Sequence, residues 1–167
     1  MLRCPGGSEA ELLCSCRGML TDGLLENAFT FSYERMRRYQ GGWHLEYKSL
    51  FPECIFLEYR DKEIPTELEK RFCDNILPPG KTGELFPITK REQEILRELG
   101  GESYCIPMSR GVIRNGITCV VNGPLKGREQ WIKKIDRHKR LAILDPKLFS
   151  GMPLVKTGLE ITEKTIG

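Results

Sequence analysis

Residues 115–144 restrict the fold and the partners of this chain more than any other segment. The first strand expected there carries two alternating sets of side chains, Ile117, Cys119 and Val121 against Thr118, Val120 and Asn122. Such alternation is typical of a β-strand, and the Asn122-Gly123-Pro124 sequence that ends it favours a tight turn. The whole segment predicts three short strands joined by two turns rich in basic side chains. We therefore expect a small twisted sheet with a basic rim.

Positive charge is concentrated in this segment. Residues 126–140 hold two acids against seven bases, which are Lys126, Arg128, Lys133, Lys134, Arg137, Lys139 and Arg140. The local charge is therefore +5 in a chain of net charge +3, so the remainder sums to about −2. Charged turns on small sheets are often only solvated. Contact with phosphates is favoured because both turns are basic and would share one end of a barrel if the strands form a meander.

Length and composition limit the remaining possibilities. A chain of 167 residues holds one ordinary domain or two small ones, and 40% hydrophobic with 29% charged residues is typical of soluble globular proteins. Its apolar runs have strand length and no export signal is visible, so we expect a cytoplasmic protein with no membrane partner. Seven cysteines without CxxC spacing argue against a disulfide framework or a structural metal site. We expect reduced, mostly buried thiols.

Three helices are predicted by one starting pattern, a hydroxyl residue with a glutamate three positions later. It occurs at Ser8 and Glu11, at Thr66 and Glu69, and at Thr89 and Glu92. This spacing forms a capping box, in which the two side chains satisfy free backbone N–H groups. Apolar residues at helical spacing follow each start, and Gly100-Gly101 is expected to end the third helix.

Between the first two predicted helices, apolar and polar residues alternate as they do in a β-strand. Phe29, Phe31 and Tyr33 alternate with polar residues, residues 40–42 favour a turn, and Trp43, Leu45 and Tyr47 alternate on the return. This predicts an antiparallel hairpin. Residues 54–57 are apolar throughout, as in a central strand with both faces covered. We therefore predict an α+β domain over 1–102, a linker over 103–108 and an all-β domain over 109–167.

The order of these parts resembles the NusG family of transcription elongation factors. Phe51-Pro52 opens a strand, Pro87-Ile88-Thr89 opens a helix, and the Gly-Pro-x-x-Gly sequence of residues 123–127 is similar to a KOW motif. Residues 33–39, Trp43-His44, residues 50–52 and residues 123–137 are most similar to specialised antiterminators of the LoaP and UpxY type. The resemblance covers nearly the whole chain. It implies an N-terminal NGN-like domain, an antiparallel sheet with helices, followed by a small SH3-like KOW barrel.

The resemblance also implies partners. The N-terminal domain would bind the clamp helices of the largest RNA polymerase subunit and favour the closed clamp, and a ligand shifts a population only by its differential affinity. The implied contacts are Phe51 and Cys54, with Phe31 and Tyr33 as weaker candidates, although such residues are more often part of the core than of an interface. The chain departs from the family pattern at Glu53 and Cys54, where relatives commonly have Gly and Tyr. Docking could therefore be weaker or differently tuned.

The KOW domain would bind a hairpin in nascent leader RNA. The implied contacts are Lys126, Arg128, Lys133, Lys134, Arg137, His138, Lys139 and Arg140. Within this set we expect the arginines to read bases and the lysines to anchor phosphates. Gln130 replaces the small residue usual in relatives, and Trp131 is expected to pack in the barrel. We expect a monomer that acts without a cofactor or a bound metal.

Two alternatives remain open, and a third is disfavoured. The chain could be a general NusG-like adaptor whose KOW domain binds another protein, although such a barrel would not need the local charge excess. It could be a ribosome-associated KOW protein that binds RNA, although this leaves the N-terminal part unexplained. A cysteine enzyme would need a general base beside a thiol. Only His44 and His138 are present and no catalytic cysteine signature occurs, so we predict that the chain is not an enzyme.

Overall fold

The computed structural model describes residues 1–6, 9–21, 23, 25–59, 70 and 83–165. In this part the chain is a mixed α+β protein with two α-helices and several sheets. It divides into two compact units: unit 1 contains Met1–Thr30 and Phe51–Ile88, and unit 2 contains Phe31–Leu50 and Thr89–Gly167. The domain boundaries expected from the sequence stay a prediction. Residues 103–108, expected as a linker, include a short strand of unit 2, β7 (Cys105–Ile106).

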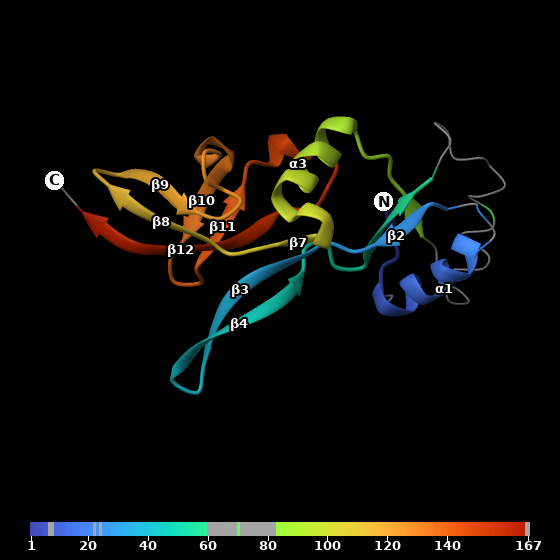
Figure 1. Cartoon of the computed structure of the whole chain (residues 1–167), viewed down its shortest axis with the longest axis horizontal. Coiled ribbons are helices and arrows are strands. Elements are labelled where there is room, and N and C mark those ends of the chain that lie inside the picture. The colour runs from blue at the N-terminus through green and yellow to red at the C-terminus, as the bar shows by residue number, and fades with distance from the viewer. Residues whose placement is uncertain (7–8, 22, 24, 60–69, 71–82, 166–167) are drawn as a thin grey trace. The chain divides into compact units, whose positions relative to one another are not determined.

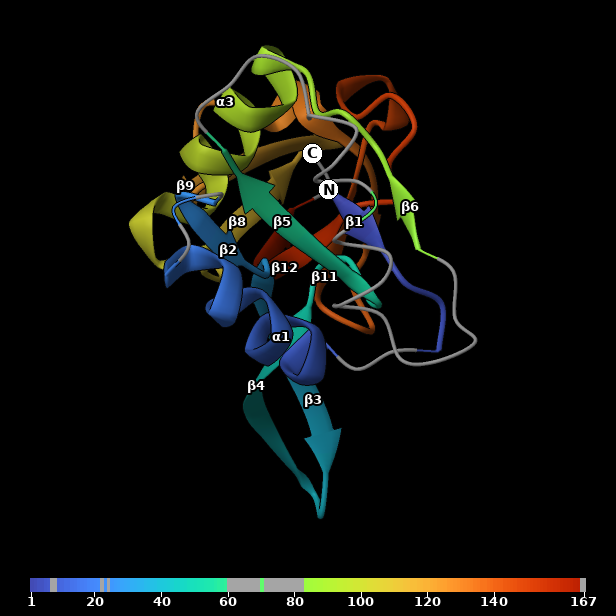
Figure 2. The same cartoon turned by 90° about the vertical axis from the view of Figure 1, so that its right-hand side faces the viewer.

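Unit 1 contains a four-stranded sheet with one helix against it (Figure 2). The strands, in the order in which they lie, are β2 (Asn27–Phe29), β5 (Cys54–Glu58), β1 (Leu2–Arg3) and β6 (Glu84–Leu85). The prediction of a central strand at 54–57 is confirmed, because β5 pairs on both sides and Cys54, Ile55 and Phe56 are buried. An apolar run of this length stabilises a strand only where other elements cover both of its faces.

The first predicted helix is confirmed as α1 (Glu9–Thr21). Its Leu12 and Cys16 are buried in one cluster with Leu2 and Ile55 of the sheet, as the helical spacing of these apolar residues requires. The expected cap, Ser8, lies outside the described residues. The second predicted helix, which starts at Thr66, lies outside them as well.

The third predicted helix is confirmed as α3 (Lys90–Gly100) of unit 2. Its capping box is complete: the Glu92 N–H donates to Thr89 Oγ1 at 3.3 Å, and the Thr89 N–H donates to Glu92 Oε2 at 2.8 Å. The helix ends where Gly101 takes a φ of 59°, a conformation that glycine adopts without strain. Ile95, Leu96 and Leu99 are buried, as their spacing predicts.

The predicted hairpin is confirmed as β3 (Ser32–Tyr39) and β4 (Gly42–Ser49). Gln40 and Gly41 both have positive φ, as a two-residue turn that matches strand twist requires. The outer part of the hairpin forms a free two-stranded ribbon that extends away from the rest of unit 2 (Figure 1). Near its base β3 also pairs with β7 in parallel, so β3 is the central strand of a three-stranded sheet.

One strand expectation was wrong. Phe29, Phe31 and Tyr33 were expected on a single strand, but β2 ends at Phe29 and β3 begins at Ser32. Phe29 pairs with Phe56 in the unit 1 sheet, whereas Ser32 and Tyr33 pair with β4 and β7. An alternating sequence shows which side chains share a face, and it gives no sign that the chain changes sheets in the middle.

The C-terminal part of unit 2 is a curled five-stranded sheet (Figure 1). Its strands, in the order in which they lie, are β10 (Ile132–Asp136), β11 (Leu141–Leu144), β12 (Lys156–Thr165), β8 (Ser109–Arg114) and β9 (Ile117–Asn122). The three predicted strands are confirmed as β9, β10 and β11. The meander on which a shared end for the two basic turns depended is not formed, because β9 and β10 are at opposite ends of the strand order and β12 pairs with β8 in parallel.

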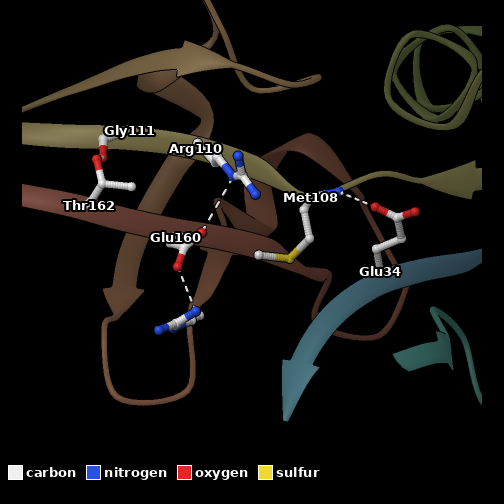
Figure 3. Close-up of polar contacts among 7 residues, drawn as sticks. Glu34, Met108, Arg110, Gly111, Glu160 and Thr162 are labelled. Carbon is white, nitrogen blue, oxygen red and sulfur yellow. Dashed lines mark hydrogen bonds and ion pairs between the residues drawn. The ribbon is translucent and has the colours of Figure 1, made fainter. Parts of the chain in front are cut away.

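The hairpin and the curled sheet approach closely where β12 crosses β3. A Cβ atom on Gly158 would collide with the Glu34 carbonyl oxygen and the Met108 sulfur. Beside this crossing the Glu34 carboxylate accepts a hydrogen bond of 2.8 Å from the Met108 N–H (Figure 3). Only glycine permits this crossing without a shift of backbone.

The thiols are less buried than the sequence predicted. Cys4, Cys16 and Cys54 are buried, Cys105 is half-buried, and Cys14 and Cys119 are exposed, all six as free cysteines. Burial raises the pKa of the Cys16 thiol to about 11. Neither of the two described helices combines the length and the apolar character needed to cross a lipid bilayer.

Gly158→Ala is expected to lower the free energy of unfolding by ~1–3 kcal/mol, because backbone must move to admit the methyl group. Chemical denaturation measures this change. Gly18→Ala is the control, because Gly18 lies in α1 with open space around its Cβ position and should gain helix propensity. Equal stabilities for Gly158→Ala and the unmodified chain would contradict the close approach.

A thiol-alkylating reagent is expected to modify Cys14 and Cys119 in the folded chain before Cys4, Cys16 and Cys54. Exposure sets this order, since the reagent must reach the sulfur, and the raised pKa of the Cys16 and Cys54 thiols further lowers the amount of reactive thiolate at those two positions. Peptide mapping by mass spectrometry after timed quenching identifies each position. Denaturant should abolish the difference, and rapid labelling of Cys16 under native conditions would count against its burial.

Candidate nucleic-acid interface

The β10–β11 hairpin presents most of the basic residues that the sequence singled out. Lys133 and Lys134 are both exposed, although consecutive residues of a strand normally point to opposite faces. A register shift between Ile132 and Lys134 explains this, because Ile132 pairs with Leu144 and Lys134 pairs with Ile143, which leaves Lys133 as an extra residue. The bulge therefore places two adjacent ammonium groups in solvent.

The turn that joins β10 to β11 adds three more exposed basic side chains, those of Arg137, His138 and Lys139. Asp136 Oδ1 accepts a hydrogen bond of 3.0 Å from the Lys139 N–H, which fixes the turn from within. The chain leaves the turn through Arg140, whose φ is 51°. The Asp136 carboxylate is thus bound to the backbone of the turn.

We call Lys133, Lys134, Arg137, His138 and Lys139 the basic hairpin surface. None of the five side chains makes an ion pair with any described residue, and all are exposed. Lys126, in the loop after β9, is also exposed and unpaired among these residues. Unpaired cations on a firm backbone are suited to phosphate contact, because binding displaces counterions and breaks no internal pair.

Arg128 has a different environment. Its Nε and Nη2 donate to Glu98 Oε2 of α3 at 3.0 and 2.9 Å, and its Nη1 donates to the Pro124 carbonyl at 3.2 Å. The guanidinium lies 5.3 Å from the centre of the Trp131 ring, which is half-buried. Arg128 therefore joins α3 to the loop between β9 and β10.

Arg140 is also engaged within unit 2. Its guanidinium lies 3.8 Å from the centre of the Trp43 ring on β4, and it pairs with the Glu160 carboxylate on β12. Glu160 also pairs with Arg110 Nε on β8 at 3.4 Å, so one acid holds two arginines (Figure 3). The planar cation of Arg140 can stack and pair at once, so Arg140 links the β3–β4 hairpin to the curled sheet.

The structure therefore divides the eight expected RNA contacts. Six side chains are exposed: those of Lys126, Lys133, Lys134, Arg137, His138 and Lys139. Arg128 and Arg140, expected to read bases, are occupied by Glu98 and Glu160. Sequence reasoning missed these acids and Trp43, because the pairs join residues 30, 20 and 97 positions apart and no local spacing indicates them.

All four residues expected to bind RNA polymerase are buried. Phe51 and Cys54 are each 1% exposed in unit 1, and Phe31 and Tyr33 are 4% and 7% exposed in unit 2. The Phe31 ring packs edge-on against Tyr104 with centres 5.6 Å apart. Burial raises the pKa of the Cys54 thiol. Their burial favours the alternative stated above, that these four side chains belong to the core.

Glu53 has a structural role that the sequence did not show. Its φ is 61°, a region that favours glycine, yet its N–H donates to Glu9 Oε1 at 3.0 Å and its Oε1 accepts from the Gly6 N–H at 2.6 Å. Its carbonyl also accepts from the Cys4 N–H at 2.9 Å. These bonds offset the strain of a side chain with positive φ.

A groove of about 710 Å³ also opens on unit 2. Glu34 and Glu98 contribute carboxylates to its lining, together with Tyr47 and Asn122, and its lining contains no lysine or arginine among the described residues. Phosphate groups would be repelled there. The basic hairpin surface is therefore the candidate nucleic-acid interface of unit 2.

No family model and no curated protein matches this chain.

Arg140→Ala is expected to lower the free energy of unfolding by ~1–3 kcal/mol, because it removes the stack on Trp43 and leaves Glu160 with one partner. Thermal or chemical unfolding provides the measurement. Lys139→Ala is the matched control, since this neighbouring side chain is exposed and makes no ion pair with a described residue, so its loss should change stability by less than ~0.5 kcal/mol. Equal effects of the two variants would show that Arg140 is no link.

Proposed function

We propose that this chain is an operon-specific transcription antitermination and elongation factor whose curled sheet binds nascent leader RNA. The observation that carries the RNA-binding part is the basic hairpin surface, whose exposed cations make no ion pair with any described residue. The order of sequence motifs, similar to the NusG family, supports the link to transcription. In this proposal the curled sheet is a KOW barrel, the N-terminal part is NGN-like, and the protein works in the cytoplasm as a monomer without a cofactor.

RNA would bind chiefly through its backbone. Lys133, Lys134, Arg137 and Lys139 present four cations from one short hairpin, and phosphates attract such clusters whatever the base sequence. Arg137 makes no ion pair within the described part of the chain, unlike Arg128 and Arg140, so its guanidinium can donate two parallel hydrogen bonds to a phosphate or a base edge. Recognition of a particular leader would then depend on the shape of its irregular stem and loop.

RNA polymerase would bind through side chains other than the four buried ones. Exposed apolar residues of β4, Leu45 and Tyr47, are 48% and 66% exposed on one face of the ribbon. Apolar side chains beside each other at such exposure mark contact surfaces more often than isolated ones do. We include Leu45 and Tyr47 in the proposed polymerase contact and assign Phe31, Tyr33, Phe51 and Cys54 to the cores of their own units.

A second candidate function, an adaptor that binds another protein, is favoured by strand β9. Ile117 and Val121 are 66% and 52% exposed, and Cys119 between them is exposed too. Glu129 Oε1 accepts from the Val120 N–H at 2.9 Å, which covers one outward-facing group of this edge strand. Hydrogen bonds from backbone N–H groups, first that of Glu129 itself and then that of Val120, lower the pKa of the Glu129 carboxyl. A protein partner would therefore contact the exposed side chains of Ile117, Cys119 and Val121.

Leader RNA is expected to bind the full chain with an affinity that falls about a hundredfold between ~50 and ~200 mM salt if four phosphates are contacted. Replacing Lys133, Lys134, Arg137 and Lys139 together by Ala should remove most of this dependence. Fluorescence anisotropy titrations at several salt concentrations measure both quantities. Lys147→Ala with Lys156→Ala is the control, because these lysines are exposed elsewhere in unit 2. Tight binding that ignores salt and these changes would exclude the RNA role.

Transcription by purified RNA polymerase through a terminator tests the cellular role. Readthrough should increase when the full chain and its leader are both present, and the four-site variant should lose the dependence on the leader. A chain that binds RNA without altering readthrough would support the ribosome-associated alternative. Binding of a protein partner that β9 substitutions abolish, without any RNA binding, would support the adaptor.

A further inference from the structure

The tip of the β3–β4 ribbon carries a stacked pair of aromatic rings that the proposed RNA contacts do not include. The Tyr39 and His44 rings lie with centres 3.8 Å apart and planes 23° from parallel, and Tyr39 is 44% exposed. Tyr39 pairs with Gly42 in the last register position before the turn. Gly42 has no side chain to cover the Tyr39 ring, and so this ring rests on His44 and keeps an open face.

The turn holds this pair on a firm backbone. Gln40 and Gly41 complete a two-residue reversal with φ of 49° and 79°. A Cβ atom at Gly42 would lie 3.3 Å from His44 Nε2, so the imidazole packs closely over Gly42 next to the turn. A ring that is already positioned loses little conformational freedom when a flat ligand binds on it.

Basic side chains share the face of the ribbon on which the pair lies. Arg37 pairs in register with His44 and therefore shares the face of the two rings, together with Arg35 and Lys48. Glu46 is the acid on this face, and it is 3.8 Å from Arg35 Nε and 3.5 Å from Arg37 Nη1. The Arg37 side chain remains 59% exposed despite this contact. On the other face Arg38 is exposed and makes no ion pair with a described residue.

We propose that the ribbon tip binds an unpaired nucleobase of RNA, which stacks on Tyr39 while Arg37 and Arg38 contact the flanking phosphates. A flat ring with an open face, flanked by more cations than acids, is the chemistry that single-stranded nucleic acid requires. A protein partner would be expected on the other face of β4, where Leu45 and Tyr47 are exposed. The inference rests on the proposed function, since it concerns which part of the RNA this chain recognises.

The tip and the basic hairpin surface belong to one unit and are connected. Trp43 precedes His44 on β4, and its ring holds the guanidinium of Arg140, the residue that ends the β10–β11 turn, on the face of the ribbon opposite the Tyr39–His44 pair. In this proposal one RNA hairpin places its stem phosphates on the basic hairpin surface and reaches around the edge of the ribbon, so that an unpaired loop base lies on the ribbon tip. Proteins that recognise RNA sequence commonly read such splayed bases by stacking on aromatic rings.

The test compares two RNAs and three variants in the full chain. One RNA is a stem closed by a uridine loop, and the other is a blunt duplex of the same stem. Tyr39→Ala should weaken the stem-loop complex roughly 5- to 150-fold, without change in the slope of affinity against salt, and leave duplex binding unchanged. Tyr39→Phe should retain the affinity, because it keeps the ring.

Leu154→Ala is the control, since Leu154 is 48% exposed, close to the 44% of Tyr39, but lies outside the ribbon. It should bind both RNAs as the unmodified chain does, and circular dichroism should show that every variant is folded. Unchanged stem-loop binding by Tyr39→Ala, or equal losses in Tyr39→Ala and Leu154→Ala, would overturn this inference and leave the proposed function intact. Failure of the unmodified chain to bind either RNA would overturn the proposed function itself.

Discussion

The arrangement of unit 2 depends on how Arg140 is held. Its guanidinium stacks on Trp43 of the ribbon and pairs with Glu160 of the curled sheet, while Glu160 also holds Arg110. A half-buried cation placed in this way is stable only if both the ring and the acid stay in position, because a charge left without partners away from water is costly. The side chain therefore connects two sheets that share no strand-to-strand hydrogen bonds, with Gly158 allowing their backbones to meet.

Arginine and lysine have separate tasks in this unit. Arg128 and Arg140 combine a planar cation with several donors, which suits them to hold a carboxylate and a ring at the same time. The lysines of the basic hairpin surface have a compact charge on a long stem and remain solvated. The total of basic residues in a segment thus overstates the charge available to a partner, and only the unpaired part contributes to attraction at a distance.

Local features of the fold were predictable from the sequence, and long-range ones were not. The Thr89–Glu92 capping box, the Gln40-Gly41 turn and the apolar strand at 54–57 depend on neighbours along the chain, and each is present. The split between β2 and β3, the strand order of the curled sheet and the burial of Phe51 depend on residues far apart in sequence. The basic segment was found as a whole, but its division into free and engaged side chains required the positions of Glu98 and Glu160.

The bulge at Lys133 shows how a surface of this kind can be altered in evolution. An extra residue inserted into an edge strand adds a side chain on the outside, while the pairs on either side, Ile132 with Leu144 and Lys134 with Ile143, keep their partners. Charge can therefore be gained or lost at this position by insertion or deletion without any rearrangement of the interior. Such a chain can acquire a new ligand preference while the residues that determine its fold stay the same.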